Sequence, residues 1–339
     1  MILRFLPDLY RYHIRCDVAC VPVSRPDANG YCSLGISNYA WRTIFENART
    51  VIFEINEHYP TLLGVDGSNR VHLSEADYIV EGEHEPLPLR TYKDSTPIDI
   101  EIAKHVVKEI PDGATLSLGV GGVPFTVAKM LAESDLKDLG CHTGTISDAF
   151  LALHKAGKLT NARKEIDTGR STFNLAMGSQ ELYNWLESEP DLFRPSDVDY
   201  VHALERMGQI SNFIGIMGGV QLDLMGQENA ESVGKRQLSS IGGQLDFLGG
   251  RLPLQGRQVL HFPELCPQGQ RGQPQVQHCA LYPRRQHGVR TPHPHSVCCH
   301  GVRHRQPRRP CPQGAGKGYD RNCPSFLPGG TGALCSRDV

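Results

Sequence analysis

The feature that most constrains this chain is a break in composition near residue 250. The first 250 of its 339 residues carry 34 of the 37 acidic side chains, whereas the remainder carries 3 acidic and 13 basic ones. That remainder also holds 12 of the 23 prolines and 7 of the 11 cysteines. Such a stretch has little apolar periodicity and many helix and strand breakers. We therefore expect a packed core only within residues 1–250, followed by an irregular, disordered tail.

Three interpretations of residues 251–339 compete. A basic arm for nucleic acid explains the arginines but not the prolines and cysteines. A zinc site could use Cys298, Cys299, His300 and His304, yet adjacent cysteines lack the C-x₂₋₄-C spacing that closes a tetrahedral site. Translation out of frame in a GC-rich gene predicts much Arg, Pro, His, Gln, Gly and Cys with little Lys, Asp or Glu. The third interpretation fits the composition best.

Net charge and hydropathy argue against some classes of partner and some cellular locations. A net charge of −2 gives no reason to expect nucleic acid or an anionic membrane. No run of about 18 apolar residues occurs, so no transmembrane helix is predicted. Arg4 and Asp8 interrupt the start of the chain before an apolar signal core can form, so export is not expected. We expect a cytoplasmic protein, and a homo-oligomer is left open.

Strands and helices alternate in the first 250 residues. Strands are predicted at 17–23, 50–55 and 115–118, and helices at 39–47, 98–109, 124–133 and 147–155. The proline-rich, polar segment 86–97 (PLPLRTYKDSTP) is the best linker candidate. This alternation predicts an α/β fold with open, largely parallel sheets.

A glycine-rich turn is the strongest local motif. In GATLSLGVGGVPF, a predicted strand leads into residues 119–123 and then into a helix that we expect to begin at Pro124. Glycines allow close approach of a ligand, and a helix start presents free N–H groups to an anion. Pro124 stands where the third glycine of G-x-G-x-x-G belongs, so the dinucleotide fingerprint does not fit. Taken alone, the motif is equally consistent with an ordinary tight turn.

Two further segments are weaker signals of a functional site. SSIGGQLDFLGG contains Gly242 and Gly243 and is, by itself, more typical of a hairpin or bulge. CHTGTISDAF places His142 and Thr143 beside Gly144. A single histidine next to a threonine is more often structural than catalytic.

Taken in order, these segments resemble the acetyl-CoA hydrolase/transferase family, especially its 4-hydroxybutyrate and butyrate:acetate CoA-transferases. The resemblance covers about residues 17–249 and is carried by VSRPDANGYCSLGIS, VHLSEADYIVE, DGATLSLGVGGVP, KDLGCHTGTISD, GSQELYNWL, VDYVH, VQLDLMGQENAESVG and IGGQLDF. It implies two CoA-transferase-type α/β domains with the active site between them. Residues 1–90 would be a remnant of the first domain, truncated at its N-terminus, and residues 95–250 an incomplete second domain.

The resemblance also bears on the tail. The family continues with Val-Val-Thr-Glu-Tyr-Gly-Ile-Ala and later with Ile-Ala-His-Pro. Residues 297–305 (VCCHGVRHR) admit the codons GTA TGT TGT CAC GGA GTA CGG CAT CGC, which encode Tyr-Val-Val-Thr-Glu-Tyr-Gly-Ile once the first base is dropped. Residues 318–325 (GYDRNCPS) admit Ala-Met-Ile-Ala-Ile-Ala-His-Pro after the same shift. The hypothesis is a frameshift near Gly250.

The resemblance implies an activity and its participants. Coenzyme A would pass between an acyl-CoA and a short-chain carboxylate such as acetate, butyrate or 4-hydroxybutyrate, through a glutamyl-CoA intermediate and without a metal. The predicted CoA contacts are Gly119, Val120, Gly121, Gly122 and Val123, with Gly243 giving a backbone contact near the thioester.

Two positions depart from the family pattern. The nucleophilic glutamate lies in a His-Ser/Thr-Glu-Met segment, and here Gly144 occupies its place in His142-Thr143-Gly144-Thr145. Met217 stands where the family has an asparagine, whose hydrogen bonds a methionine cannot replace. The prediction is an inactive CoA-transferase. The alternatives are a non-catalytic CoA-binding remnant or pseudogene product and, second, an acyl-CoA hydrolase.

Overall fold

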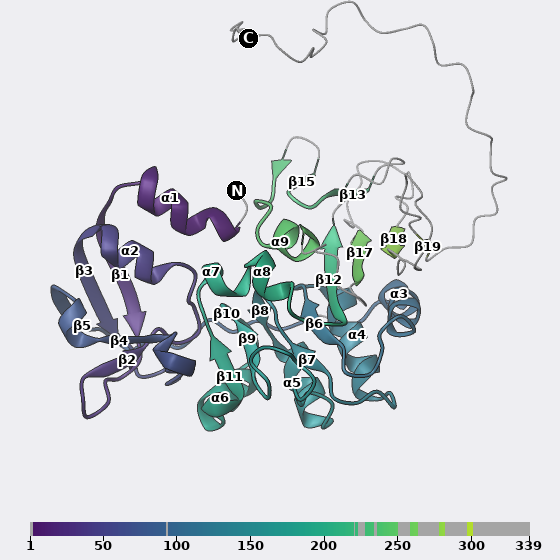
Figure 1. The fold of residues 1–339 in the computed structure, drawn as a ribbon, viewed down its shortest axis with the longest axis horizontal. Coiled ribbons are helices and arrows are strands. Elements are labelled where there is room, and N and C mark those ends of the chain that lie inside the picture. The colour runs from purple at the N-terminus through teal and green to yellow at the C-terminus, as the bar shows by residue number, and fades with distance from the viewer. Residues whose placement is uncertain are drawn as a thin grey trace, which may run out of the picture. The chain divides into compact units, whose positions relative to one another are not determined.

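The computed structural model of the chain describes residues 3–219 except residue 93, then 221–222, 228–233 and 236–249, and three strands at 258–263, 278–281 and 297–300. All of them lie in Met1–Val302, the first of the two units into which the chain divides. The second unit, Arg303–Val339, lies outside the described residues. Figure 1 follows the described elements from purple to green.

The N-terminal part of the chain builds a three-stranded parallel sheet in the order β1-β3-β5. A second, antiparallel pair is formed by β2 and β4. The elements are α1 (Leu6–Tyr12), β1 (Cys16–Val23), β2 (Tyr31–Ser33), α2 (Trp41–Asn47), β3 (Ala48–Ile55), β4 (Arg70–His72) and β5 (Tyr78–Glu81), with short 3₁₀ turns at Leu3–Phe5, Val65–Gly67 and Leu73–Glu75.

Alternation of side chains explains why β1 and β3 pair. Successive residues of a strand face opposite sides, so Val21 and Val23 in β1 and Val51, Phe53 and Ile55 in β3 share one face. These side chains form a small core under the sheet. By contrast, all four residues of β5 are exposed.

Glu81 and Pro97 are joined by a segment in which the described residues form no helix or strand, and its role as a linker between domains stays a prediction. Helix α3 (Pro97–Val107) begins at the end of this segment. The Thr96 hydroxyl accepts a hydrogen bond from the Asp99 N–H, and the Asp99 carboxylate accepts one from the Thr96 N–H. This capping box fixes the helix start, with Pro97 in the first turn.

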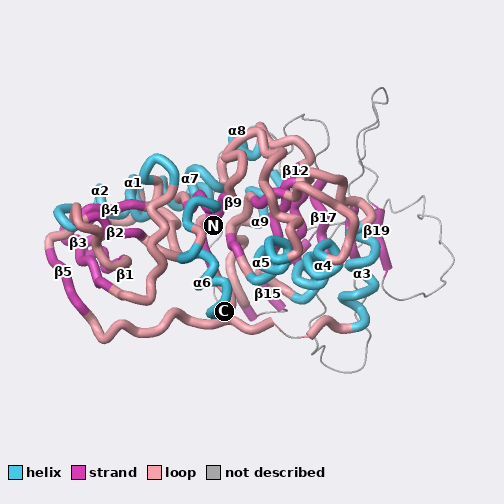
Figure 2. Tube along the Cα trace, turned by 90° about the horizontal axis from the view of Figure 1, so that it is seen from below, coloured by secondary structure: helices cyan, strands magenta, loops and turns pink. Residues whose placement is uncertain are grey.

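The main sheet has the strand order β19-β18-β17-β12-β6-β7. Strands β17, β12, β6 and β7 run parallel, whereas β17, β18 and β19 pair antiparallel. Helices α3, α4 and α5 lie in a row and pack against one another in that order (Figure 2). The strands are β6 (Thr115–Leu118), β7 (Gly140–Cys141), β12 (Phe213–Gly219), β17 (Gln258–Pro263), β18 (His278–Leu281) and β19 (Val297–His300).

Smaller elements complete the second part. The helices are α4 (Gly122–Ala132), α5 (Asp148–Lys155), α6 (Gln180–Ser188), α7 (Val198–Val201), α8 (Leu204–Met207) and α9 (Gln244–Gly249), with a 3₁₀ turn at Pro190–Leu192. Two-residue or three-residue strands pair as β8 (Thr145–Ile146) with β10 (Leu175–Ala176), β9 (Ser171–Phe173) with β11 (Phe193–Pro195), β13 (Gln221–Leu222) with β14 (Glu228–Asn229), and β15 (Ser232–Val233) with β16 (Arg236–Gln237).

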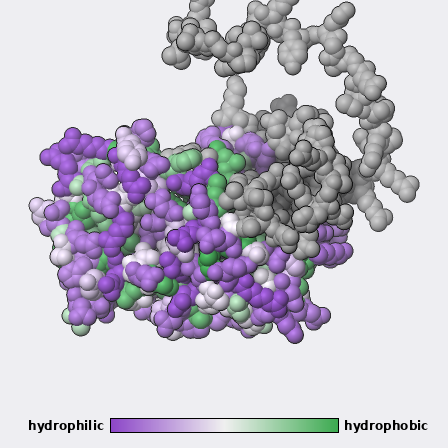
Figure 3. All heavy atoms as spheres, in the orientation of Figure 1, coloured by the Kyte–Doolittle hydropathy of each residue, from purple (hydrophilic) through white to green (hydrophobic). Residues whose placement is uncertain are grey.

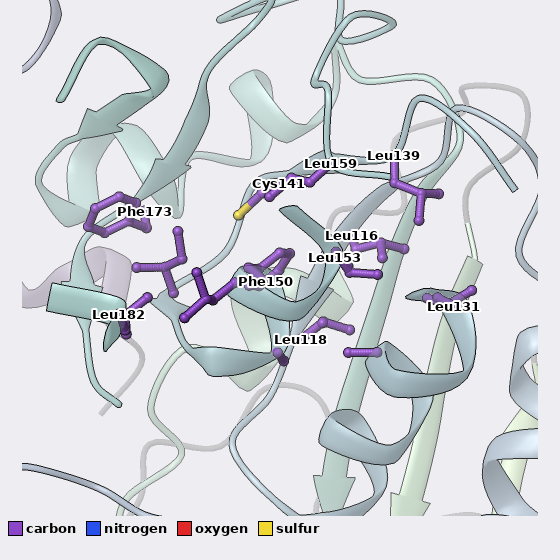
Figure 4. Close-up of a cluster of buried hydrophobic side chains, with 14 of the residues drawn as sticks. Leu116, Leu118, Leu131, Leu139, Cys141, Phe150, Leu153, Leu159, Phe173 and Leu182 are labelled. Atoms are coloured by element: carbon purple, nitrogen blue, oxygen red, sulfur yellow. The ribbon is translucent and has the colours of Figure 1, made fainter. Parts of the chain in front are cut away.

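The larger hydrophobic core lies between the main sheet and its helices. Leu116 and Leu118 of β6 meet Leu131 of α4 and Phe150 of α5 in this cluster, and none of the four is more than 1% exposed (Figure 4). Burying each such side chain contributes about 1.5–3 kcal/mol. This core fixes the ends of β6 and β7, from which the candidate site extends.

The predicted α/β class with largely parallel sheets is confirmed. The predicted strands and helices of the first 155 residues recur with shifts of one or two residues at their ends. One detail was wrong, because α4 begins at Gly122 and Pro124 is its third residue. The proline is tolerated there since the first four N–H groups of a helix have no intrahelical acceptor.

The tail differs from the predicted irregular segment at three places. The short apolar runs QVLHFP, HCAL and VCCH form β17, β18 and β19, and β17 pairs along most of β12. Short apolar runs of this length are typical of strands. The rest of the predicted tail lies outside the described residues.

The described surface carries no long apolar element. In the part of the chain that the structure describes, no helix has the length and hydrophobicity needed to cross a bilayer. On the face drawn in Figure 3, hydrophilic residues predominate and hydrophobic ones form small patches between them.

Candidate functional site

A cavity of about 140 Å³ opens where the parallel strands β6, β7 and β12 reach their carboxyl ends. Ligands of open α/β sheets characteristically bind at this edge. The residues that line it are Leu3, Tyr39, Ser117, Leu118, Gly119, Val120, Thr143, Gly144, Thr145, Asn174, His202, Met217, Gly243, Gln244 and Phe247.

The loop after β6 forms one wall. The Gly119 N–H donates to the Ile216 carbonyl over 2.8 Å, which continues the pairing of β6 with β12. A Cβ at position 119 would lie 3.2 Å from that carbonyl oxygen and 3.5 Å from the Met217 Cα. Close approach of the two strands therefore favours glycine here.

The segment between β7 and β8 forms the opposite wall and is held from behind by a buried lysine. Lys164 Nζ donates to the Cys141 carbonyl over 2.8 Å and to the Thr172 hydroxyl over 3.0 Å. Burial lowers the pKa of Lys164 to about 8, although the neighbouring Cys141 and Asp167 act to raise it. Its hydrogen bonds fix the backbone that leads to Thr143 and Gly144.

Gly144 faces the cavity with space for a side chain. Its φ does not lie in the left-handed region that favours glycine. A Cβ built there would lie 3.4 Å from His202 Nε2, 3.4 Å from Phe247 Cε2 and 3.6 Å from Asn174 Oδ1. These are ordinary or nearly ordinary contacts, so the fold accepts a side chain at this position and directs it towards two polar groups.

Three polar atoms of the His202 and Asn174 side chains have no hydrogen-bond partner among the described residues. Asn174 lies between β9 and β10, His202 follows α7, and each is 1% exposed. Both amide atoms of Asn174 and the Nε2 atom of His202 are buried and unpaired. Because both side chains line the cavity, these atoms are the candidate partners of a ligand or of a reacting group.

Asp246 orients the His202 ring from the side away from Gly144. The Asp246 Oδ2 atom lies 3.0 Å from His202 Nδ1, and both side chains are buried. The backbone N–H of Arg4 donates to the same carboxylate over 3.2 Å, and the Arg4 guanidinium lies 3.5 Å from Oδ1. The ring is thereby fixed with Nε2 towards the cavity.

His142 serves the structure and does not reach the cavity. Its Nε2 atom lies 2.8 Å from the Val201 carbonyl, and the ring packs edge-on against Phe213. Burial, assisted by the nearby Lys164 charge, lowers the pKa of His142 to about 3. The ring is therefore neutral at neutral pH and ties the β7–β8 segment to the end of α7.

The structure brings together five of the eight residues predicted from the sequence for the site. Gly119, Val120, Gly144, Met217 and Gly243 all line the cavity. Their roles in CoA binding and catalysis stay predictions. The Met217 side chain is mostly buried against Phe247, on the same wall as Gly119.

The other three predicted residues lie outside the cavity lining. Gly121 caps α4, and a Cβ on Gly122 would meet Asp99 Oδ2 at 3.1 Å. The Val123 side chain belongs to the large core. Any contact of this segment with a ligand would have to come from its backbone.

Sequence reasoning missed Asn174 and His202 and did not assign a role to Asp246. For Asp246 the only sequence signal was its position inside IGGQLDF, and for His202 its position at the end of VDYVH. Neither signal shows that residues 174, 202 and 246 meet around residue 144. Among the described residues, no group of three or more His, Cys, Asp or Glu side chains comes together as metal ligands would.

Comparison with known proteins gives matches along most of the described chain. Residues 3–89 match the model of the acetyl-CoA hydrolase/transferase N-terminal domain, and residues 178–291 match that of the C-terminal domain. A butyryl-CoA:acetate CoA-transferase of Anaerostipes caccae is 44% identical over 247 residues, which are 72% of this chain and 55% of that protein.

Solved structures of other proteins match the chain as well. RipA from Yersinia pestis superposes with a TM-score of 0.70 at 36% identity, over 76% of this chain and 57% of that chain. A 4-hydroxybutyrate CoA-transferase from Porphyromonas gingivalis gives a TM-score of 0.67 at 29% identity, over 76% and 61% of the two chains. The chain belongs to the acetyl-CoA hydrolase/transferase family. It spans about half the length of the curated relatives it matches, for example 55% of the A. caccae protein.

Both family matches contribute to the cavity. Leu3 and Tyr39 come from the range that matches the N-terminal domain of the acetyl-CoA hydrolase/transferase family, and His202, Met217 and Gly243 from the range that matches its C-terminal domain. Gly144 lies between the two ranges. The Leu3 N–H donates to the Gly242 carbonyl over 3.2 Å, which places the start of the chain beside α9 (Figure 1).

Proposed function

We propose that this chain carries the acyl-CoA site of a CoA-transferase but does not transfer coenzyme A, because glycine stands at the nucleophile position. The substrates of the parent activity would be an acyl-CoA and a small carboxylate of the acetate, butyrate or 4-hydroxybutyrate type. The loop after β6 and the start of α9 would contact CoA. Support comes from the family membership and from the convergence of Gly119, Gly144 and Gly243 on one cavity.

The missing group explains the expected loss of activity. On the glutamyl-CoA route, a carboxylate oxygen bonds to the thioester carbonyl carbon, the C–S bond breaks, and the CoA thiolate leaves. The thiolate then attacks the glutamyl carbonyl and releases the acyl carboxylate. A tethered, oriented nucleophile is worth roughly 7–11 kcal/mol of activation free energy. Hydrogen at Gly144 cannot supply any part of this step.

A single observation carries the proposal. The Cβ direction of Gly144 opens between His202 Nε2 and Asn174 Oδ1, two buried polar atoms without partners among the described residues. Asn174 Oδ1 can only accept, so the donor that this amide offers to a carboxylate at residue 144 is its unpaired Nδ2 atom. The surroundings of a nucleophile are thus present, whereas the nucleophile is absent.

Trapping of the covalent intermediate tests the proposal. Protein incubated with butyryl-CoA and then with borohydride is digested and analysed by mass spectrometry. We expect no adduct in the wild type, an adduct at residue 144 in Gly144→Glu, and none in the neutral control Gly144→Gln. A covalent CoA adduct anywhere on the wild-type chain would overturn the proposal. Cooperative unfolding shows whether the Gly144→Glu variant is folded. If it is folded and still forms no adduct, residue 144 is not the position of the nucleophile.

A second candidate, acyl-CoA hydrolysis, is favoured by the His202–Asp246 pair. With Nδ1–H donated to Asp246, a neutral His202 ring can accept a proton from water at Nε2, as a general base does. The measurement is release of free CoA thiol from butyryl-CoA without acetate. Hydrolysis through this pair should be lost in His202→Ala, and a rate equal in both proteins excludes it.

We also propose that the reading frame departs from that of the family after Gly250. The two landmark segments that reappear on dropping one base, together with the change in composition, support this. The match to the C-terminal domain nevertheless runs to residue 291, past the change in composition. Sequencing the gene decides: the shifted frame should encode both landmarks, and the idea fails if it encodes neither. The same sequencing run also shows which residue codon 144 encodes.

A further inference from the structure

The first described residues of the chain form part of the cavity wall. Leu3, at the start of the 3₁₀ turn Leu3–Phe5, lines the cavity, and its N–H donates to the Gly242 carbonyl over 3.2 Å. Helix α1 follows this turn directly and packs against α2 and α7 (Figure 1). Residues 3–12, the turn and α1 together, are called the strap below.

Arg4 ties the start of the strap to a buried carboxylate. The Arg4 N–H donates to Asp246 Oδ2 over 3.2 Å, and Nη1 of its guanidinium lies 3.5 Å from Oδ1. The Asp246 side chain is 0% exposed, whereas that of Arg4 is 29% exposed. A buried carboxylate that loses a cation has less compensation for its lost hydration, so this ion pair favours the strap in its observed place.

Little apolar burial holds the strap to the rest of the fold. Among its described residues only Pro7 is buried. Phe5 is 47% exposed and Tyr12 is 74% exposed. Segments with few buried apolar contacts open locally at a lower free energy than the whole fold. Separation of the strap from the cavity therefore does not require the hydrophobic core to open.

The other end of the strap has its own anchor. Arg11 Nη2 donates to the Thr43 hydroxyl over 3.1 Å and lies 3.6 Å from Asp199 Oδ2. These contacts join α1 to α2 and to α7, away from Asp246. The two ends of the strap are thus held separately, and the Arg4 end can leave Asp246 while the Arg11 end stays in place.

The strap and the cavity share one carboxylate oxygen. Asp246 Oδ2 accepts from the Arg4 N–H and also lies 3.0 Å from His202 Nδ1. His202 and Leu3 both line the cavity, and the His202 ring is 1% exposed. Departure of Leu3 and Arg4 removes part of the wall on this side and exposes the unpaired Nε2 atom of His202.

We propose that residues 3–12 are a strap that closes the cavity, with the Arg4–Asp246 ion pair as its latch. In the open state Arg4 is separated from Asp246, and solutes reach Gly144 and His202. In the closed state Leu3 completes the wall. The proposal concerns access to the cavity and holds whether or not the chain binds coenzyme A, so its failure is distinguishable from failure of the proposed function.

The test measures how fast His202 reacts with diethyl pyrocarbonate, which modifies accessible imidazoles. The full-length protein is treated briefly, digested, and quantified peptide by peptide by mass spectrometry. Exposed His105 should react fast, and His142, which is 0% exposed and outside the cavity lining, should react slowest. Arg4→Ala removes the latch cation and should raise the rate at His202 about tenfold, because the rate follows the open population. The rates at His105 and His142 should not change.

Matched variants separate the latch from other effects. Arg4→Lys keeps a cation near Asp246 and should react at close to the wild-type rate. Arg15→Ala removes an exposed arginine that pairs with Asp17 at 3.8 Å, and it should leave the His202 rate unchanged. Hydrogen exchange should rise in peptides covering residues 3–12 of Arg4→Ala and stay constant in β6.

Three results would overturn the proposal. One is an unchanged His202 rate in folded Arg4→Ala, and another is a wild-type His202 that reacts as fast as His105. The third is an equal rise at His142, which would mean that the whole fold opens. If Arg4→Ala does not fold, Leu3→Ala carries the test, because it shortens the side chain with which the strap lines the cavity and should also speed the reaction at His202.

Discussion

His142, two residues before Gly144, couples folding of the chain to pH. Burial lowers the pKa of His142 to about 3 in the folded chain, from 6.5 for the unperturbed group. Between these values the unfolded chain binds a proton that the folded chain does not, so stability is lost as pH falls below about 6.5. The slope from one such group is at most about 1.4 kcal/mol per pH unit.

We therefore predict that the wild type loses about 2 kcal/mol of unfolding free energy through His142 between pH 7 and pH 5. Urea unfolding at the two pH values measures this loss. In His142→Gln, which has no group titrating in this range, that part of the pH dependence should disappear. An equal loss in both proteins would show that His142 is not the group responsible.

At the scale of elements, the start of α9 packs closely against the end of α7, because Gly243 lies against the His202 ring. A Cβ on Gly243 would lie 2.3 Å from His202 Cε1 and 3.0 Å from His202 Nδ1. The His202 ring would have to shift, which would disturb its contact with Asp246. Since overpacking of this kind costs about 1–3 kcal/mol, Gly243→Ala should lower the unfolding free energy by that amount.

A double-mutant cycle tests the cause of this loss. If the clash with the ring is responsible, Gly243→Ala should cost clearly less when His202→Ala is already present. Chemical denaturation of the wild type, the two single variants and the double variant supplies the four free energies. Additive losses would mean that the two residues do not interact in this way.

Much of this element structure could be predicted from the sequence, because local signals determine it. The β-branched run at β3 and the Thr96–Asp99 capping box specify their elements within a few residues. Of the residues that line the cavity, the resemblance predicted Gly119, Val120, Gly144, Met217 and Gly243, whose roles stay predictions. Asn174 and His202 are separated from Gly144 by 30 and 58 residues of sequence, and only tertiary packing brings them together.

For the molecule as a whole, we predict that the exposed edge strand β5 promotes self-association. β5 pairs with β3 on one side, and no described strand pairs with its other side. Tyr78, Ile79 and Val80 are 64%, 47% and 47% exposed on this edge. An exposed apolar edge offers unpaired backbone groups to a second chain.

Ile79→Lys should therefore reduce aggregation while leaving folding unchanged, because a charged side chain on an edge strand opposes pairing with another copy. The unfolding free energy should stay within about 0.5 kcal/mol of the wild type, as for most surface substitutions. Light scattering and sedimentation at matched concentrations measure the association. Ile79→Val keeps the edge apolar and should associate as the wild type does. If Ile79→Lys also associates to the same extent, β5 is not the surface through which the copies meet.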